Sequence, residues 1–504
     1  MKNKVTLFPV LFSTLLMSWL FYLETMGLNL LIYEAILLAW LFFTKQIPLE
    51  TRVQKIVLSG FVVTGIATVF IHSTFSYVVH YLLFILQVGL WSYPLFRSLL
   101  HAGAQAFLNF FVAQWNFGRN LFNLQLRGKD FGYYLRKAGI LVIPLIVVLV
   151  FFSIYRTSNP LFDKWFGDTG KWIAQAIENF FNYLDTPVFV TLFWSFVFSN
   201  FIFFRKSTAF ITDDDIQARE DAIRKRRIGI LGFKTTSLKN EYKAAVFMLA
   251  ALNLLLLVMN FSDIRLVWFG FDWEGQYLKQ FVHEGTYLLI YSILISIGIV
   301  LYFFRGNLNF YKKNKLLKKL SYVWLAQNAF LAVSVGMRNY WYITYYALAY
   351  KRIGVLLFLI LTIYGLYSVY RKISKHKTAR YLFRVNFQSL LILLTLSSLI
   401  DWDTAIARYN FSHAGKSFVH FSFLVDLSDK TLPYLDKSLP VLKQIQESQK
   451  DFPSEKHNLR PEEYYDQIQK RKINFLEEWE TKSLLEWNWP EYKAAVMLKK
   501  PQSP

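Results

Sequence analysis

Ionisable residues inside apolar runs are the strongest chemical signals in this sequence. Glu34 lies within the apolar run Leu28–Phe43, and an unpaired carboxylate at membrane depth costs a few kcal/mol. Glu34 could carry a proton or a cation, or it could be held by a polar group of a neighbouring helix. We expect a polar partner, because a carboxylate that faced lipid would be neutral and costly.

A second group of charged and aromatic residues stands where several apolar runs end. Its members are Glu284, Arg338, Tyr342, Tyr346, Lys351, Arg352, Asp401 and Asp403. A cationic, tyrosine-lined patch of this kind could hold the phosphate of a lipid head group. Alternatively, the tyrosines form an aromatic belt at the membrane surface and Arg338 pairs with Asp401 or Asp403. We favour the ion-pair network and predict that Arg338 is buried and paired.

The sequence predicts no catalytic, metal or cofactor site. Cysteine is absent and the eight histidines have no ligand spacing, which excludes disulfides and thiolate-bound metals. Three adjacent acids follow Thr212 and could suggest a divalent-cation site. They are also typical of a helix that is capped at Thr212 and has an acidic first turn, and we predict this helix.

Composition identifies the class of protein that must position these residues. Of 504 residues, 54% are hydrophobic and only 18% are charged, which excludes an ordinary cytosolic enzyme. The net charge of +22 lies wholly in the first 400 residues, which hold 41 basic and 18 acidic residues. Because these basic residues lie in loops between apolar runs, they indicate membrane orientation and contact with anionic lipids, with no nucleic-acid partner.

Eleven apolar runs are long enough to predict membrane-spanning helices. They are Val5–Tyr22, Leu28–Phe43, Ile56–Ile71, Tyr77–Phe96, Ala138–Tyr155, Pro187–Phe204, Ala244–Asn260, Tyr287–Phe304, Leu317–Gly336, Ile353–Tyr370 and Leu382–Ile400. Loops rich in Lys and Arg alternate with loops that are poor in them, which predicts a cytoplasmic N-terminus and an external C-terminus. The fold class is therefore an all-α, polytopic integral membrane protein.

The chain changes character after Ile400. Residues 401–504 have nearly balanced charge and apolar residues at helical spacing. We predict two domains: a transmembrane domain of residues 1–400, and a small, soluble, external helical module that docks on the outer surface.

Five short motifs carry a resemblance to a known family. They are Gly27-Leu28-Asn29-Leu30, Asn159-Pro160-Leu161-Phe162, His283-Glu284-Gly285, Arg338–Tyr342 with Tyr346–Ile353, and Ile406-Ala407-Arg408-Tyr409-Asn410. In this series the chain resembles a bacterial membrane family, domain of unknown function 4173, and its close relative 4153. The family has Tyr-Gly-Leu-Thr where this chain has Tyr346-Ala347-Leu348-Ala349. The resemblance implies a multi-pass protein of the bacterial inner membrane and implies no activity or cofactor.

Three classes of function fit these observations. A scaffold or regulatory protein of the bacterial envelope requires nothing beyond the predicted topology, and it is our first expectation. A transporter or lipid-handling protein fits the number of spans and Glu34, although no broken-helix repeat marks a central site. An enzyme that acts on lipid-linked substrates would need an acid/base or metal constellation, and no residue spacing demands one. The sequence therefore leaves enzymatic activity open.

Overall fold

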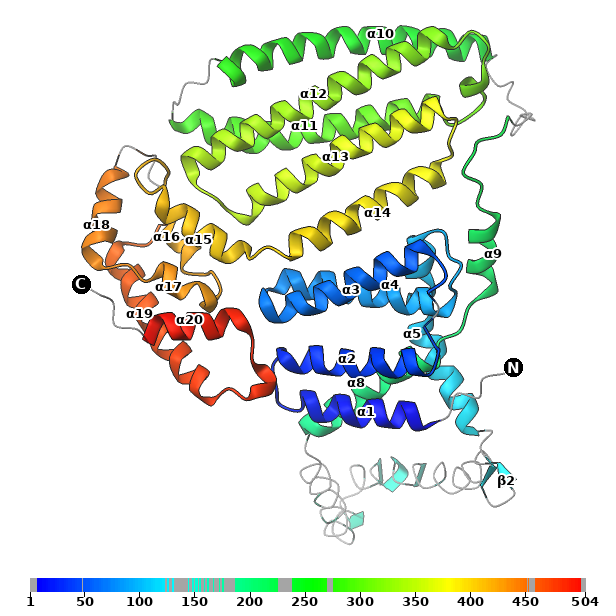
Figure 1. The fold of residues 1–504 in the computed structure, drawn as a ribbon, viewed down its shortest axis with the longest axis vertical. Coiled ribbons are helices and arrows are strands. Elements are labelled where there is room, and N and C mark those ends of the chain that lie inside the picture. The colour runs from blue at the N-terminus through cyan, green and yellow to red at the C-terminus, as the bar shows by residue number, and fades with distance from the viewer. Residues whose placement is uncertain are drawn as a thin grey trace.

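The computed structural model describes residues 7–47, 49–122, 186–224, 238–269, 275–450, 452 and 458–499, with short stretches between 125 and 175, and it describes 275–286 by their backbone alone. These residues are almost entirely helical, as the sequence predicts (Figure 1). The N-terminal helices are α1 (Leu7–Phe21), α2 (Leu28–Phe43), α3 (Arg52–Phe70), α4 (Thr74–Ser92), α5 (Leu99–Phe122), α8 (Thr186–Phe203) and α9 (Ala209–Gln217). Two-residue strands β1 (Gln125–Leu126) and β2 (Lys129–Asp130) form one antiparallel pair.

A second bundle follows in the chain. It consists of α10 (Leu238–Asp263) with the π-helical η1 (Ile264–Phe269), α11 (Gly275–Phe303), the 3₁₀ helix η2 (Asn307–Phe310), α12 (Lys315–Tyr346), α13 (Tyr350–Ser374) and α14 (Ala379–Ser398). Each bundle has its own apolar core, and α14 packs on α13 as well as on α3, α4 and α5. Thus α14 joins the two bundles.

The C-terminal module, residues 402–499, covers one end of both bundles (Figure 1). It contains α15 (Trp402–Ser412), α16 (Phe421–Leu424), η3 (Asp429–Thr431), α17 (Leu432–Leu435), α18 (Leu439–Ser448), α19 (Pro461–Thr481), η4 (Leu484–Glu486) and α20 (Trp489–Lys499). Tyr464 is fully buried in the core of this module, where its hydroxyl donates to the carbonyl of Leu435. The segment is therefore folded, and the domain boundary at residue 400 stays a prediction.

The turn between α1 and α2 contacts the module through its backbone. The amide of Leu28 donates to the carbonyl of Trp487 over 3.0 Å, and the amide of Thr25 donates to Glu486 over 2.5 Å. A Cβ atom at Gly27 would lie 2.4 Å from the backbone carbonyl carbon of Glu486. This backbone approach requires glycine.

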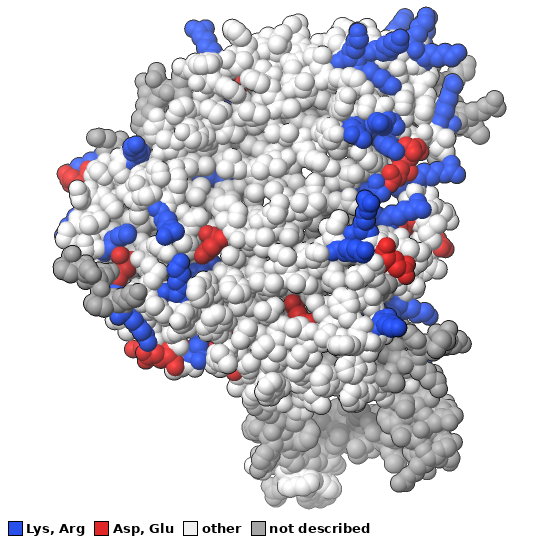
Figure 2. Space-filling view, viewed as in Figure 1, with Lys and Arg blue, Asp and Glu red and all other residues white. Residues whose placement is uncertain are grey.

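Charges mark the opposite end of the bundles. Lys and Arg side chains gather along this edge, whereas the band between it and the module is almost free of charge (Figure 2). We call this edge the basic end; it includes the loops 44–51, 93–98, 204–208, 304–314 and 375–378. The end that carries the C-terminal module is called the module end. An apolar band between two polar ends is the arrangement that a bilayer requires.

Among the described helices, fewer have the length and hydropathy of a membrane span than the sequence predicts. Ten of the eleven predicted spans fall on helices, and Ala138–Tyr155 lies largely outside the described residues. Among the described helices, six are long and apolar enough to cross a membrane, namely α3, α4, α8, α10 with η1, α12 and α13. The pair α14 and α15, bent by 63°, would make a seventh. Helices α1, α2 and residues 287–303 of α11 are apolar but shorter, so a total of eleven is not confirmed.

Candidate functional site

Glu34 has a polar partner in a neighbouring helix. Its Oε1 lies 2.6 Å from Nε2 of His80 on α4, and both side chains are buried. Nδ1 of the same imidazole lies 3.1 Å from the hydroxyl of Thr64 on α3. Phe61 stacks on the imidazole ring, with centroids 4.8 Å apart. The structure therefore joins α2, α4 and α3 through one carboxylate, one imidazole and one hydroxyl.

The imidazole of His80 bridges Glu34 and Thr64. The hydroxyl of Thr64 lies 2.9 Å from the carbonyl of Gly60 and 3.1 Å from the carbonyl of Phe61, as well as against Nδ1 of His80. If the hydroxyl donates to one of these carbonyls, it accepts from Nδ1–H of His80, and one proton is then shared between Nε2 of His80 and Oε1 of Glu34. In that arrangement the two side chains together carry no net charge, which lowers the cost of their burial at membrane depth.

Replacement of Glu34 tests this pairing. Glu34→Leu should lower the free energy of unfolding by about 1–3 kcal/mol, because His80 would keep a buried polar nitrogen without its partner. Glu34→Gln should lower the free energy of unfolding by less, since its amide can donate to Nε2 of His80. Thermal unfolding in detergent measures both, with Ile36→Leu on the same helix as the control. Equal melting temperatures for wild type and Glu34→Leu would contradict the pairing.

Arg338 is buried and paired, as predicted, but the predicted partner is wrong. The guanidinium donates to Oδ1 of Asp263 at the end of α10, and the hydroxyl of Ser334 donates to Oδ2 over 2.6 Å. Arg338 and Asp263 are 4% and 2% exposed. The reason is helix adjacency: α12 packs along α10, although α11 separates them in the chain.

Asp401 and Asp403 belong to a different group, centred on Lys430 of the C-terminal module. The Lys430 ammonium lies 3.0 Å from Asp401 and 3.5 Å from Asp403, and it also donates to the carbonyls of Ile71 and His72. Asp401 caps α15 through the amide and hydroxyl of Thr404. Sequence reasoning missed Lys430, because nothing in the sequence marks it among the module's basic residues.

Asp403 has two further partners. It accepts from the hydroxyls of Tyr350 and Ser428, each over 2.5 Å. The Lys430 ammonium pairs with both carboxylates, and the two hydroxyls donate to Asp403. These charge-assisted bonds link the module to the bundles.

Arg352 makes a third separate group, at the end of α12. It donates to the carbonyls of Tyr346 and Ala347, and its guanidinium stacks 4.3 Å from the ring centroid of Tyr342. Lys351 is exposed, and the side chain of Glu284 lies outside the described residues. In the contacts described above, Arg338, Arg352 and the two aspartates of the predicted group thus have three different sets of partners.

Ala347 adopts a backbone conformation that suits glycine. Its φ is 61° and its ψ is −171°, a region that is essentially restricted to glycine and costs other residues about 1–3 kcal/mol. Ala347→Gly should raise the free energy of unfolding by about 1 kcal/mol, after the larger entropy of unfolded glycine is subtracted. A thermal-unfolding comparison with Ala349→Gly, where φ is −150°, measures this. A lower melting temperature for Ala347→Gly would show that the strain is absent.

Of the three acids after Thr212, Asp213 is exposed, and basic and backbone donors hold the other two. Helix α9 begins at Ala209 with Thr208 as its N-cap and has no acid in its first turn, so the predicted cap at Thr212 and the predicted acidic first turn are both wrong. Hydrogen bonds from Arg380 and then from His101 hold the pKa of Asp214 below its usual value. Asp215 accepts from the amides of Arg97 and Ser98. In the part of the chain that the structure describes, no group of three His, Asp or Glu residues could hold a metal ion.

A large cleft at the basic end was not predicted from the sequence. It has a volume of about 1310 Å³ and lies between α11, α13 and α14, with Leu100 and residues 217–223 at its edge. Ordinary small-molecule pockets measure about 300–1,000 Å³. Its walls are mostly apolar and include Ile297, Leu301 and Phe383. The cleft is therefore large enough for an amphiphile bigger than a usual metabolite.

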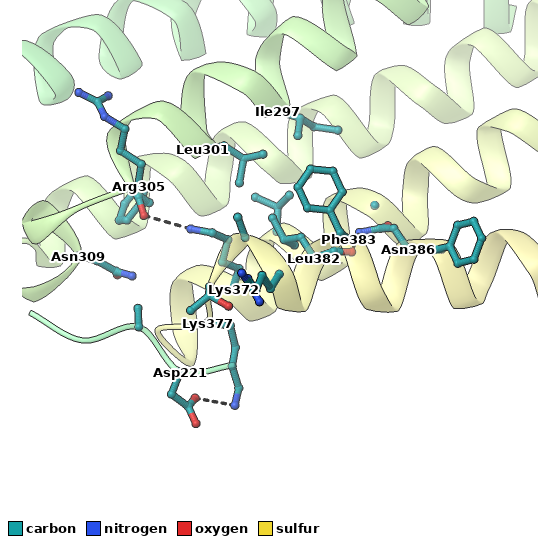
Figure 3. Close-up of a pocket in the computed structure, with 18 of the residues that line it drawn as sticks. Asp221, Ile297, Leu301, Arg305, Asn309, Lys372, Lys377, Leu382, Phe383 and Asn386 are labelled. Atoms are coloured by element: carbon teal, nitrogen blue, oxygen red, sulfur yellow. Dashed lines mark hydrogen bonds and ion pairs between the residues drawn. The ribbon is translucent and has the colours of Figure 1, made fainter. Parts of the chain in front are cut away.

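Charged side chains gather at one end of this cleft (Figure 3). Lys377 pairs with Asp221 over 2.6 Å, and Lys372 donates to the carbonyl of Phe304 over 3.0 Å. Arg305 stacks on Tyr302 and lies 4.0 Å from Glu241. The cleft thus combines a long apolar wall with a cationic end, which is the pattern of an amphiphile with an anionic head.

Comparison with known proteins agrees with the motifs in the sequence. No curated protein and no solved structure matches the chain. A family model, described as Domain of unknown function (DUF4153), matches residues 34–438. This match covers most of the chain and includes Glu34, the cleft, and Lys430 with its two carboxylates. The protein belongs to the DUF4153 family.

Proposed function

We propose that this membrane protein binds a lipid-like amphiphile in the cleft between α11, α13 and α14. The cleft itself supports this proposal most strongly, because it joins about 1310 Å³ of mainly apolar space to a cationic end. Among the functions that the sequence leaves open, lipid handling is one that would use an apolar cleft with a cationic end directly. Specific binding of a soluble metabolite would need several polar groups along the wall.

The proposed location is the bacterial inner membrane, with the basic end in the cytoplasm and the module on the outside. The support is the concentration of Lys and Arg at one end of the apolar band (Figure 2), since cytoplasmic loops carry an excess of these residues. The cleft then opens at the cytoplasmic leaflet, where anionic lipids attract basic side chains.

Filling the cleft tests the proposal. Gly365 lines it, and a Cβ atom there would only touch the amide oxygen of Asn386 at 3.6 Å. Gly365→Phe should therefore fold and place a ring in the cleft. Gly354→Phe is the matched control, because Gly354 lies on the same helix with nothing within 4 Å of its Cβ position.

We expect native mass spectrometry to show bound lipid on wild type and Gly354→Phe and much less on Gly365→Phe. Equal lipid retention by all three proteins would contradict the proposal.

A scaffold or regulatory role in the envelope is the second candidate. Its support is two exposed apolar side chains of the C-terminal module, Ile473 and Leu484, which are 57% and 75% exposed. Such a role would depend on the module end and would be insensitive to Gly365→Phe.

A further inference from the structure

Lys372 is the buried cation of the cleft. Its side chain is on the last turn of α13 and is 4% exposed. The ammonium donates to the carbonyl of Phe304, just beyond the end of α11. A helix end supplies only about half a unit of negative charge, and an ammonium has three donors. Lys372 therefore keeps positive charge and donor capacity in the cleft.

The other cations at this end are mostly neutralised by carboxylates. Lys377 pairs with Asp221, Arg380 pairs with Asp214, and Arg305 faces Glu241. Among the described residues, no carboxylate lies within ion-pair distance of Lys372 or of the exposed Arg219. Since both residues line the cleft, its charged end has an excess of positive charge and would favour an anion over a zwitterion.

The wall is long enough to cover one leaflet of a bilayer. The residues of α13 that line the cleft run from Lys372 to Phe358, which is about 21 Å along a helix. Half of the hydrocarbon core measures about 15 Å. An acyl chain whose head group lay at Lys372 would thus have apolar wall beside it along its whole length.

We infer that Lys372 binds the phosphate of an anionic glycerophospholipid from the leaflet at the basic end, with the acyl chains along α11, α13 and α14. This inference rests on the proposed function and adds the lipid class and the head-group residue. The Phe304 carbonyl orients the ammonium, and the phosphate oxygens accept from its remaining donors.

The test is lipid competition on the full-length protein. Wild type is equilibrated with equal amounts of phosphatidylglycerol and phosphatidylcholine, and the bound lipid is measured by native mass spectrometry. Wild type should retain mainly phosphatidylglycerol. Lys372→Gln should weaken its binding by about tenfold or more, whereas Lys372→Arg should stay close to wild type. Lys375→Gln is the matched control, since Lys375 is exposed next to the same helix end and does not line the cleft.

Several results would overturn the inference. Equal retention of the two lipids by wild type would do so without any variant, which matters if Lys372→Gln fails to fold. Displacement of phosphatidylglycerol by excess inorganic phosphate would identify a soluble anion as the ligand. If Gly365→Phe abolishes lipid binding and Lys372→Gln does not, the head-group assignment fails while the proposed function stands. If neither variant changes binding, both fail.

Discussion

Asp263→Ala is expected to destabilise the protein by about 3–5 kcal/mol, the usual cost of removing one partner of a buried ion pair. The loss is large because Arg338 is 4% exposed and would lose the carboxylate to which its guanidinium donates. The hydroxyl of Ser334 would also lose its acceptor. Thermal or denaturant unfolding of the purified protein in detergent measures the change.

Two variants separate the charge from the hydrogen bond. Asp263→Asn keeps an acceptor for Ser334, so its stability should lie between that of wild type and that of Asp263→Ala. Asp213→Ala removes an exposed acid on α9 and should change stability by less than about 0.5 kcal/mol. If Asp263→Ala were as stable as Asp213→Ala, the buried pair would not contribute to the fold.

Gly27→Ala is expected to release the C-terminal module from the α1–α2 turn. The new methyl group would lie 2.4 Å from both the carbonyl carbon and the oxygen of Glu486, so one backbone must move. Movement would break the bond from Leu28 to Trp487 and the bond from Thr25 to Glu486. We expect a loss of about 1–3 kcal/mol, typical of overpacking.

Hydrogen exchange measures this release. Amides of η4 and of the start of α20 should exchange faster in Gly27→Ala than in wild type, while those of α3 and α4 stay protected. Gly415→Ala is the control, since a Cβ atom there has nothing within 4 Å. Unchanged exchange in residues 483–492 would mean that the turn adapts to the methyl group and that docking does not depend on Gly27.

The sequence predicts the helices and the need for partners better than it predicts the partners. Apolar runs locate ten helices, and the cost of a buried carboxylate predicts that Glu34 is paired. The same reasoning predicts that Arg338 is buried, but its partner depends on which helices are neighbours. Asp263 and Asp401 both follow apolar runs that end on the same side, and only the packing of α12 on α10 selects Asp263.

The cleft has no signal of its own in the sequence. Lys372 resembles any basic residue near the end of a membrane helix, and Gly365 resembles any small residue within one. Their shared site exists because α11, α13 and α14 leave space between them, which hydropathy cannot predict.

The contacts of the α1–α2 turn also determine the order in which the protein can be completed. This turn is synthesised before its hydrogen-bond partners in residues 483–487, which lie some 460 positions further along the chain. Lys430 likewise reaches back to the carbonyls of Ile71 and His72. During synthesis, α1 and α2 must therefore stand for a time without the hydrogen-bond partners of the turn between them. A chain truncated before residue 483 would contain both bundles but would lack the hydrogen-bond partners of the α1–α2 turn.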